Sequence, residues 1–170
     1  MRKIRYSVAM SLDGYIAGPD GDYDWIISDP EIDFAAMFNQ FDIFLIGRKT
    51  FETMAREGRT EIPGKKIIVF SNTLEGKNYP GITVVGGNYK PLLTSLREES
   101  GKDIWLFGGG SLFASLLEAG FVDSVEVAIA PVLLGAGIPL LPAITKRTKL
   151  QLTGHRIYKT GIVTLNYAVA

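Results

Sequence analysis

Short apolar runs alternate with amphipathic segments along the first two thirds of the chain. The apolar runs are bounded by glycine or polar residues, which is typical of buried strands. The segments between them carry apolar residues three and four positions apart, which is typical of helices. Predicted strands cover residues 5–10, 42–47, 65–71, 81–87, 102–110 and 123–135, and predicted helices cover residues 29–41, 48–58, 89–101 and 111–120. This alternation predicts right-handed crossovers and therefore a parallel sheet.

The two ends of the chain differ from this pattern. A proline and several glycines within "SLDGYIAGPDGD", residues 11–22, predict a long loop that holds a short strand at Tyr15–Ala17. Residues 151–169 predict an antiparallel hairpin that turns near Lys159–Gly161. Since no repeat or linker interrupts the chain, residues 1–170 are predicted to form one α/β domain. The predicted fold class is a mixed, mainly parallel central sheet flanked by helices, with a C-terminal antiparallel hairpin.

Composition excludes several classes of function. Of the 170 residues, 46% are hydrophobic and 21% are charged, as in an average soluble domain. The 18 basic and 18 acidic residues cancel, which argues against a nucleic-acid-binding protein. The absence of cysteine excludes disulfides, thiolate metal sites and a cysteine nucleophile. No apolar run approaches the roughly 18 residues of a membrane span, and the N-terminus predicts a strand rather than a signal peptide, so we expect a cytoplasmic protein.

Glycines end three of the predicted strands. They lie in "LIGRKT" at Gly47, in "VVGGNYK" at Gly86–Gly87 and in "LFGGGSL" at Gly108–Gly110. Carboxyl ends of parallel strands meet at one edge of a sheet, where open α/β folds usually bind ligands. A helix N-terminus offers free N–H donors, and glycine lets a phosphate approach them. The sequence therefore predicts an anion site at this edge, with the charges of Arg48 and Lys49 beside it.

A purely structural interpretation stays open for each turn taken alone. Glycine is common at such turns in any α/β fold, and "GGGSLF" does not match the G-x-G-x-x-G dinucleotide fingerprint. The shared position of the turns favours a functional role without specifying the anion. Ser71 and Asn72, which follow the apolar run "IIVF", add short polar groups at a further strand end.

Five segments then carry a resemblance to a known family. They are "SLDGYIAG", "LIGRKTFETM", "IIVFSNT", "LFGGGSLFASLLEAGFVDSVEVAIAPVLLGAGIPLL" and the closing hairpin. In this order they resemble the dihydrofolate reductase fold, and even more the reductase domain of the riboflavin-biosynthesis deaminase–reductases and its small stand-alone relatives. The resemblance covers nearly the whole chain, and "PVLLGAGIPLL" points to the riboflavin-type branch. No deaminase domain is expected, because the chain has neither cysteine nor a His-x-Glu motif.

The resemblance implies an NADPH-dependent reductase. By analogy, the "GGGSL" turn would hold the pyrophosphate, and "GRKT" would wrap it from the other side. Arg48 or Lys49, with Ser71 and Asn72, would meet the 2′-phosphate. A cis peptide bond is expected at Gly108–Gly109, as in dihydrofolate reductases. Ala9 and Ile16 would line the nicotinamide. The residues implied in cofactor binding are Ala9, Ile16, Gly47, Arg48, Lys49, Thr50, Ser71, Asn72, Gly108, Gly109, Gly110, Ser111 and Leu112.

Candidates for substrate chemistry lie in the N-terminal loop and the helix expected after it. Asp13 in "SLDG" matches the riboflavin-type reductases and is the candidate proton donor, although Asp-Gly is also a strong turn pair. Asp33 lies near the place of the substrate carboxylate of dihydrofolate reductases, or else is an exposed residue of a helix that Asp29 would cap. Trp25 would cover a flat heterocycle, or pack in the core. With His155 as the only histidine, no metal site is predicted.

Three functions follow from these features. The leading hypothesis is an NADPH-dependent reductase of a small pyrimidine- or pteridine-like heterocycle. A true reductase of 5-amino-6-(5-phosphoribosylamino)uracil is an alternative, which the acidic character of residues 13–24 disfavours because the substrate carries a phosphate. The third is a nucleotide-binding dimer without turnover. Apolar stretches in the C-terminal strands need covering and predict a homodimer.

Overall fold

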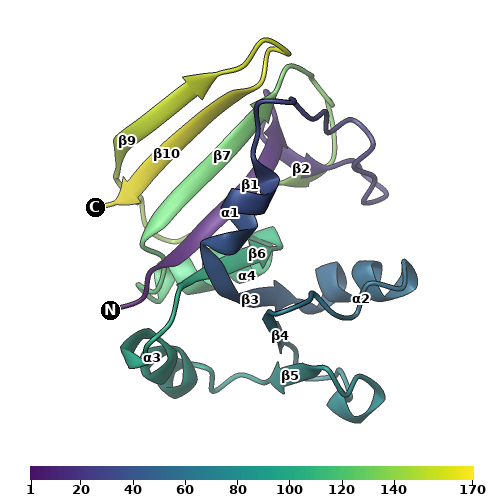
Figure 1. The fold of residues 1–170 in the computed structure, drawn as a ribbon, viewed down its shortest axis with the longest axis vertical. Coiled ribbons are helices and arrows are strands. Elements are labelled where there is room, and N and C mark those ends of the chain that lie inside the picture. The colour runs from purple at the N-terminus through teal and green to yellow at the C-terminus, as the bar shows by residue number, and fades with distance from the viewer.

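The computed structural model describes residues 1–170 and contains one eight-stranded sheet in the order β5-β4-β3-β6-β1-β7-β10-β9 (Figure 1). Its strands are β1 (Ile4–Ser11), β3 (Phe41–Gly47), β4 (Lys66–Phe70), β5 (Ile82–Val85), β6 (Asp103–Gly108), β7 (Ser124–Ala130), β9 (Leu150–Ile157) and β10 (Val163–Val169). The helices are α1 (Phe34–Asn39), α2 (Arg48–Arg56), α3 (Lys90–Glu98) and α4 (Gly110–Glu118), with a 3₁₀ turn, η1, at Gly76–Asn78.

The pairing of the strands confirms the predicted fold class. The strands from β5 to β7 in this order are all parallel to their neighbours. β10 then pairs antiparallel with β7, and β9 antiparallel with β10. The hairpin turns where the sequence predicts, since Tyr158 N–H donates to the Ile162 carbonyl and Gly161 N–H to that of Tyr158. Figure 1 shows this hairpin and β5 at opposite ends of the sheet.

The helices bury apolar stripes against the two faces of the sheet. One core cluster joins Leu93 and Leu96 of α3 and Phe113 of α4 to strand residues such as Tyr6, whose ring stacks on Phe113 at 3.9 Å between centroids. The second cluster includes Phe51 of α2 and centres on aromatic rings of β3 and β6. These stripes follow the apolar spacing of the sequence, so burial explains why the predicted helices form where they do.

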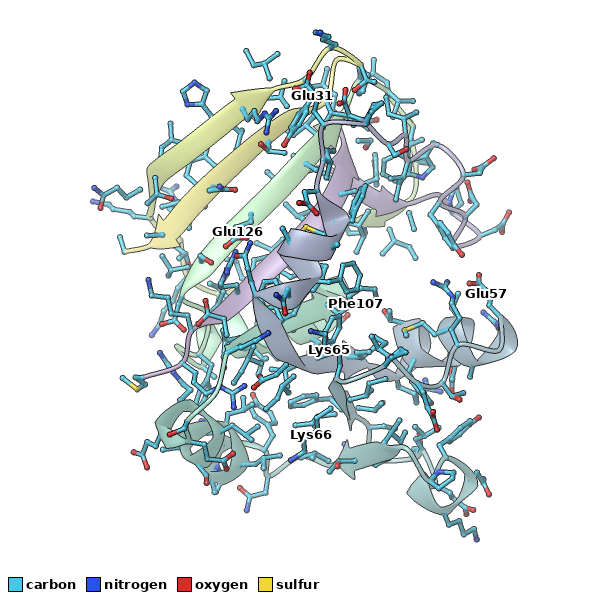
Figure 2. All side chains as sticks on the ribbon, in the orientation of Figure 1. Glu31, Glu57, Lys65, Lys66, Phe107 and Glu126 are labelled. Carbon is cyan, nitrogen blue, oxygen red and sulfur yellow. The ribbon has the colours of Figure 1, made fainter.

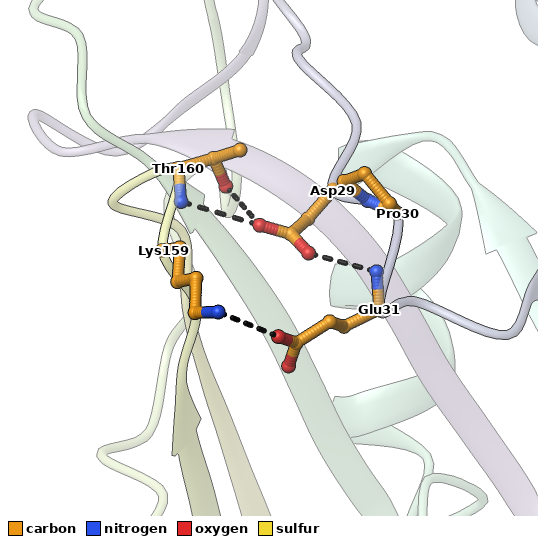
Figure 3. A pocket seen from close by; sticks show the side chains of 5 residues that line it. All are labelled: Asp29, Pro30, Glu31, Lys159 and Thr160. Atoms are coloured by element: carbon orange, nitrogen blue, oxygen red, sulfur yellow. Dashed lines mark hydrogen bonds and ion pairs between the residues drawn. The ribbon is translucent and has the colours of Figure 1, made fainter.

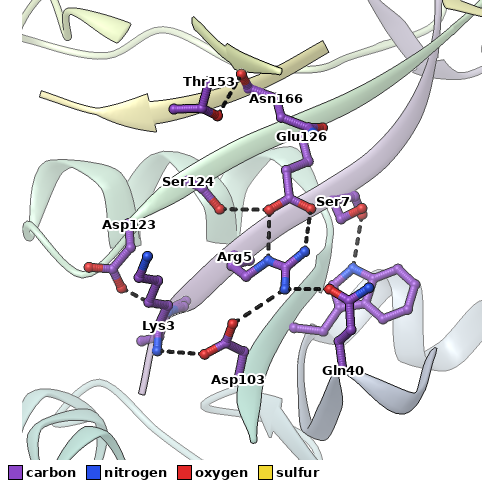
Figure 4. Close-up of polar contacts among 12 residues, drawn as sticks. Lys3, Arg5, Ser7, Gln40, Asp103, Asp123, Ser124, Glu126, Thr153 and Asn166 are labelled. Atoms are coloured by element: carbon purple, nitrogen blue, oxygen red, sulfur yellow. Dashed lines mark hydrogen bonds and ion pairs between the residues drawn. The ribbon is translucent and has the colours of Figure 1, made fainter. Parts of the chain in front are cut away.

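A polar cluster lies on β1 and its neighbours (Figure 4). Arg5 forms a fork with Glu126, through Nε to Oε1 at 2.7 Å and through an η nitrogen to Oε2 at 2.9 Å. The same guanidinium donates to Gln40 and Asp103. Because half-buried charges need partners, this arrangement allows Arg5 to lie within the sheet.

Two predicted boundaries are wrong. The helix predicted over residues 29–41 is shorter, because only α1, Phe34–Asn39, is helical. Asp29 does not cap it. Its buried carboxylate accepts hydrogen bonds from Glu31 N–H and from Thr160 instead. The strand predicted over 123–135 ends at Ala130, because Pro131 has no N–H to continue the ladder.

A small second sheet was not predicted. β2 (Tyr15–Ala17), the expected short strand, pairs antiparallel with β8 (Ile138–Pro139), which the sequence pattern does not reveal. This pairing joins the N-terminal loop to the segment that follows β7.

Candidate functional site

The carboxyl ends of five neighbouring parallel strands form a row along one edge of the sheet. In the order β5, β4, β3, β6 and β1, these ends lead into Gly86, Ser71, Gly47, Gly109 and the loop after Ser11. The three glycine turns and the polar pair after β4 are therefore brought to one edge, as the parallel topology requires.

The two turns that the resemblance assigns to phosphate binding touch each other. A Cβ added at Gly47 would lie 3.3 Å from the Gly109 nitrogen and 3.8 Å from Leu112 Cβ. A Cβ added at Gly109 would lie 3.3 Å from Thr50 Oγ1. The Gly108–Gly109 peptide bond is cis, as expected, and Gly108 has a φ of +149°, which favours glycine. Side chains at Gly47 or Gly109 would push the two turns apart.

Gly110 is explained by a different contact. A Cβ there would lie 2.9 Å from the carbonyl oxygen of Pro139 and 3.2 Å from that of Leu140. The backbone at the end of β8 thus lies directly against the first turn of α4. The run of three glycines therefore permits two close backbone contacts. One is with the turn after β3, and the other is with the segment after β7.

Two helix N-termini point their donors into this region. α2 and α4 begin after Gly47 and Gly109, and neither N-cap residue supplies a side-chain hydrogen bond. The first N–H groups of both helices, including those of Lys49 and Ser111, are therefore available to an anion. A diphosphate fits this donor set, because both helix dipoles favour negative charge.

The charged and polar side chains beside the turns differ in how many partners they have within the protein. Arg48 is exposed and pairs with Glu52 at 3.1 Å, whereas the side chain of Lys49 is exposed and forms no ion pair. Ser71 Oγ accepts the N–H groups of Thr73 and Leu74, at 3.1 and 2.9 Å, and also lies 3.5 Å from the Thr73 hydroxyl. Its O–H proton can therefore be donated to Thr73 or to a ligand.

The remaining cofactor candidates lie on the flanks of this region. Asn72 Oδ1 lies next to Gly86, 2.9 Å from where a Cβ would stand. Ala9 is half-buried on β1 and pairs with Ala128, and Ile16 is half-buried on β2.

Three hydrogen bonds hold the carboxylate of Asp13, the candidate proton donor. Its carboxylate accepts hydrogen bonds from Ser11 Oγ at 2.6 Å, from Gly135 N–H at 2.7 Å and from Leu134 N–H at 3.1 Å. The Ser11 hydroxyl most of all, then the two backbone donors, lower the pKa of Asp13 to about 2. The carboxylate form is thus favoured, and the role of Asp13 as the proton donor stays a prediction.

The two substrate candidates are Trp25, within the N-terminal loop, and Asp33, at its end. Asp33 is the N-cap of α1: its Oδ1 accepts the N–H of Ala36 at 2.8 Å, while Oδ2 takes part in none of the protein's hydrogen bonds. Trp25 is half-buried and donates from Nε1 to the Asp22 carbonyl at 3.2 Å. Asp33 therefore keeps one acceptor for a ligand.

The loop is held at two further places. Near its end, Asp29 bonds to Thr160 and Glu31 pairs with Lys159, around the small hollow of Figure 3. Near its middle, Tyr23 Oη donates to Glu57 Oε1 at 2.7 Å, beyond the C-terminal end of α2 (Figure 2). The loop thus connects the hairpin to α2.

An aromatic wall beside the site was missed by the sequence analysis. Phe107, the residue before Gly108, lies 5.5 Å from Trp105 and 5.7 Å from Phe44 between ring centroids, and Phe38 of α1 lies 5.0 Å from Trp105. Figure 2 shows Phe107 between the ribbons of α1 and α2. Phe107 is half-buried, so it offers a ring face beside the glycine turn. Its position as the last apolar residue before the glycines was the available signal.

Comparison with known proteins identifies the family. The family described as RibD C-terminal domain matches residues 2–164. The chain belongs to this family. The uncharacterised protein YyaP of Bacillus subtilis (strain 168) is 34% identical over 98% of this chain and 94% of that protein.

Solved structures share the fold of this RibD C-terminal domain. A putative riboflavin biosynthesis protein from Shewanella sp. PV-4 has a TM-score of 0.84 at 23% identity, covering 99% of both chains. Dihydrofolate reductase from Enterococcus faecalis, solved with NADP(H), has a TM-score of 0.67 at 18% identity, covering 98% of this chain and 96% of that one. The resemblance stated from the sequence is thus confirmed at the level of family and fold.

Two further features concern membranes and metal ions. None of the helices is long and apolar enough to span a membrane. No three histidine, cysteine, aspartate or glutamate side chains come together as metal ligands.

Proposed function

We propose that this RibD C-terminal domain protein is an NADPH-dependent reductase of a small pyrimidine- or pteridine-like heterocycle. The observation that carries the proposal is the contact between the two uncapped helix N-termini at Gly47 and Gly109, which gathers free N–H donors at one point. Family membership and the likeness to an NADP(H)-bound dihydrofolate reductase support a dinucleotide as the anion.

In this proposal the chain binds and orients the cofactor. The first N–H groups of α2 and α4 hold the diphosphate, and Lys49 and the Ser71 hydroxyl meet the 2′-phosphate. Ala9 and Ile16 line the nicotinamide end, and Thr50 and Leu112 fill the sides of the turns. When bound, NADPH supplies the hydride that reduces a C=N or C=O bond, while a proton goes to the nitrogen or oxygen.

We propose an uncharged, flat substrate. Phe107 and Trp25 supply ring faces, and Oδ2 of Asp33 accepts an N–H group of the heterocycle. A phosphorylated substrate is disfavoured, because the cationic side chains that contact the loop already form ion pairs with carboxylates. Arg59 pairs with Glu57, and both Arg156 and Lys159 pair with Glu31.

We also propose a homodimer through the edge strand β9. Leu150, Leu152 and Ile157 of this strand are exposed, the last by 72% of its surface. An exposed apolar edge strand is a site for association with a second copy. Light scattering at micromolar concentration should give the mass of a dimer, and Leu152→Lys should give the monomer. A wild-type monomer would contradict this proposal.

Turnover is the direct test of the proposed function. The purified protein would be mixed with NADPH and with dihydrofolate, dihydropterins or ribosylaminouracils with and without the 5′-phosphate, and loss of NADPH absorbance would be followed. Oxidation of NADPH with an unphosphorylated heterocycle is the expected result. NADPH binding without oxidation by any compound would favour a nucleotide-binding dimer without turnover, and preference for the phosphorylated compound would favour the riboflavin-pathway reaction.

A further inference from the structure

The Asp13 carboxylate joins two loops that lie more than a hundred residues apart in the chain. Oδ1 accepts the N–H of Leu134 and Oδ2 that of Gly135, while Ser11 Oγ fixes the carboxylate from its own side. Leu134 and Gly135 belong to no strand or helix, so no backbone ladder satisfies their N–H groups. A carboxylate is suited to this position because it accepts two backbone N–H groups at once.

Backbone hydrogen bonds join the same two segments on both sides of Asp13. Leu12 N–H donates to the Val132 carbonyl at 2.9 Å, and Leu140 N–H donates to that of Gly14 at 2.9 Å. Next to the second of these bonds, β2 and β8 pair as a small sheet. The loop after β1 and the segment from residue 131 to residue 142, here called the 131–142 segment, therefore form one unit.

The far end of the 131–142 segment lies on the candidate phosphate site. The Pro139 and Leu140 carbonyl oxygens stand 2.9 and 3.2 Å from the place of a Cβ on Gly110, and Pro142 Cδ stands 3.2 Å from it. A continuous set of contacts thus runs from Asp13 through this segment to the first turn of α4, where Gly110 and Ser111 offer free N–H groups.

We infer that Asp13 is a positioning residue, whose carboxylate holds the 131–142 segment against the first turn of α4 and thereby sets the affinity of that turn for the cofactor diphosphate. This inference rests on the proposed cofactor site. A proton donor would instead need a protonated carboxyl group, whereas three hydrogen bonds stabilise the carboxylate here.

The test is NADPH affinity without substrate, so that the chemical step does not enter. Asp13→Asn puts an amide N–H₂ against one of the two backbone donors and so removes the side-chain part of this contact. We expect NADPH to bind about 5-fold more weakly or worse. Electrostatics alone predicts the opposite sign, because removal of a negative charge near an anion site strengthens anion binding. Asp20→Asn, a change of an exposed carboxylate of the same loop that takes part in no hydrogen bond or ion pair, is the matched control and should bind NADPH at least as tightly as the wild type.

Amide hydrogen exchange gives an independent readout. In Asp13→Asn the amides of Leu134 and Gly135 should exchange faster, while those of the α3 core stay protected. Should Asp13→Asn fail to fold, Ser11→Ala keeps the carboxylate but loses one of its three bonds, and should weaken NADPH binding by about 2-fold.

The outcomes separate this inference from the proposed function. Unchanged NADPH affinity in Asp13→Asn, with turnover lost, would overturn the positioning role and return Asp13 to the chemical step. If the wild type itself binds no NADPH, the proposed cofactor site is wrong and the link from Asp13 to the cofactor is overturned with it. Weaker NADPH binding together with faster exchange at Leu134 and Gly135 would support the inference.

Discussion

The glycine turns and the N-terminal loop lie side by side, yet they are built in opposite ways. Each glycine turn is made by consecutive residues that end a buried strand and begin a helix, as at Gly47 and Gly109. The loop between β1 and α1 contains only the short strand β2 and is held by polar side chains: Asp13, Tyr23 and Asp29 each bond to residues far along the chain. The first region depends on local sequence, the second on distant partners.

This difference predicts that the glycine turns bind the cofactor, whereas the side chains that hold the loop position it. Changes at the helix N-termini should act on cofactor affinity and leave the fold intact, because the exposed positions there pack against nothing else. Changes at the loop anchors should act on stability and loop motion, with smaller effects on the cofactor.

The largest effect is expected from a negative charge at the start of α4. Ser111→Asp should weaken NADPH binding by about 100-fold or more, because the carboxylate would stand among the N–H donors of the diphosphate. An acidic residue in the first helical turn favours the helix dipole, so the melting temperature should stay equal or rise. Ser115→Asp, one turn further along on an exposed position, is the control and should bind NADPH almost normally. Calorimetry measures the affinity; equal losses in both variants would contradict the site.

A smaller effect is expected at the side chain proposed for the 2′-phosphate. Lys49→Gln should weaken NADPH binding by about 10-fold and leave NADH binding unchanged, because only NADPH carries that phosphate. Lys146→Gln, at an exposed loop position, controls for the loss of one charge. If both cofactors weaken equally, Lys49 does not contact the 2′-phosphate.

The anchor at Asp29 should affect stability rather than binding. Backbone N–H of Glu31, then the hydroxyl of Thr160, lower the pKa of Asp29 below its ordinary value. A lowered pKa stabilises the fold above the ordinary carboxyl pKa, and this contribution is lost as the pH falls through it towards the folded value. Asp29→Asn should therefore melt at a lower temperature at neutral pH, with a gap to the wild type that narrows below about pH 4. A gap that does not depend on pH would show that the carboxylate charge is not what stabilises this anchor.

The smallest effect is expected at Tyr23, which is 44% exposed. Tyr23→Phe removes the hydrogen bond to Glu57 and should speed amide exchange in residues 18–27. NADPH affinity should change by no more than about 2-fold, as for other exposed polar contacts. A loss as large as that of Lys49→Gln would show that the loop and α2 act as one binding unit.

The sequence predicted what local patterns determine. Strand–helix alternation is sufficient for the parallel sheet, because right-handed crossovers leave few other topologies, and each glycine turn follows from its own strand end. The helix predicted at 29–41 failed because Asp29 bonds to Thr160, a residue 131 positions away. The role of Asp13 and the strand β8 depend on a similar long-range contact, with the segment after Ala130, which no periodicity reveals.

Titration of the wild-type protein with NADPH and, separately, with NADH by calorimetry tests the central claim most directly. If the helix N-termini at Gly47 and Gly109 hold a dinucleotide, NADPH should bind with micromolar affinity and NADH about 10-fold more weakly. No binding of either cofactor would contradict the account, and the glycine edge would then serve another ligand or the fold alone.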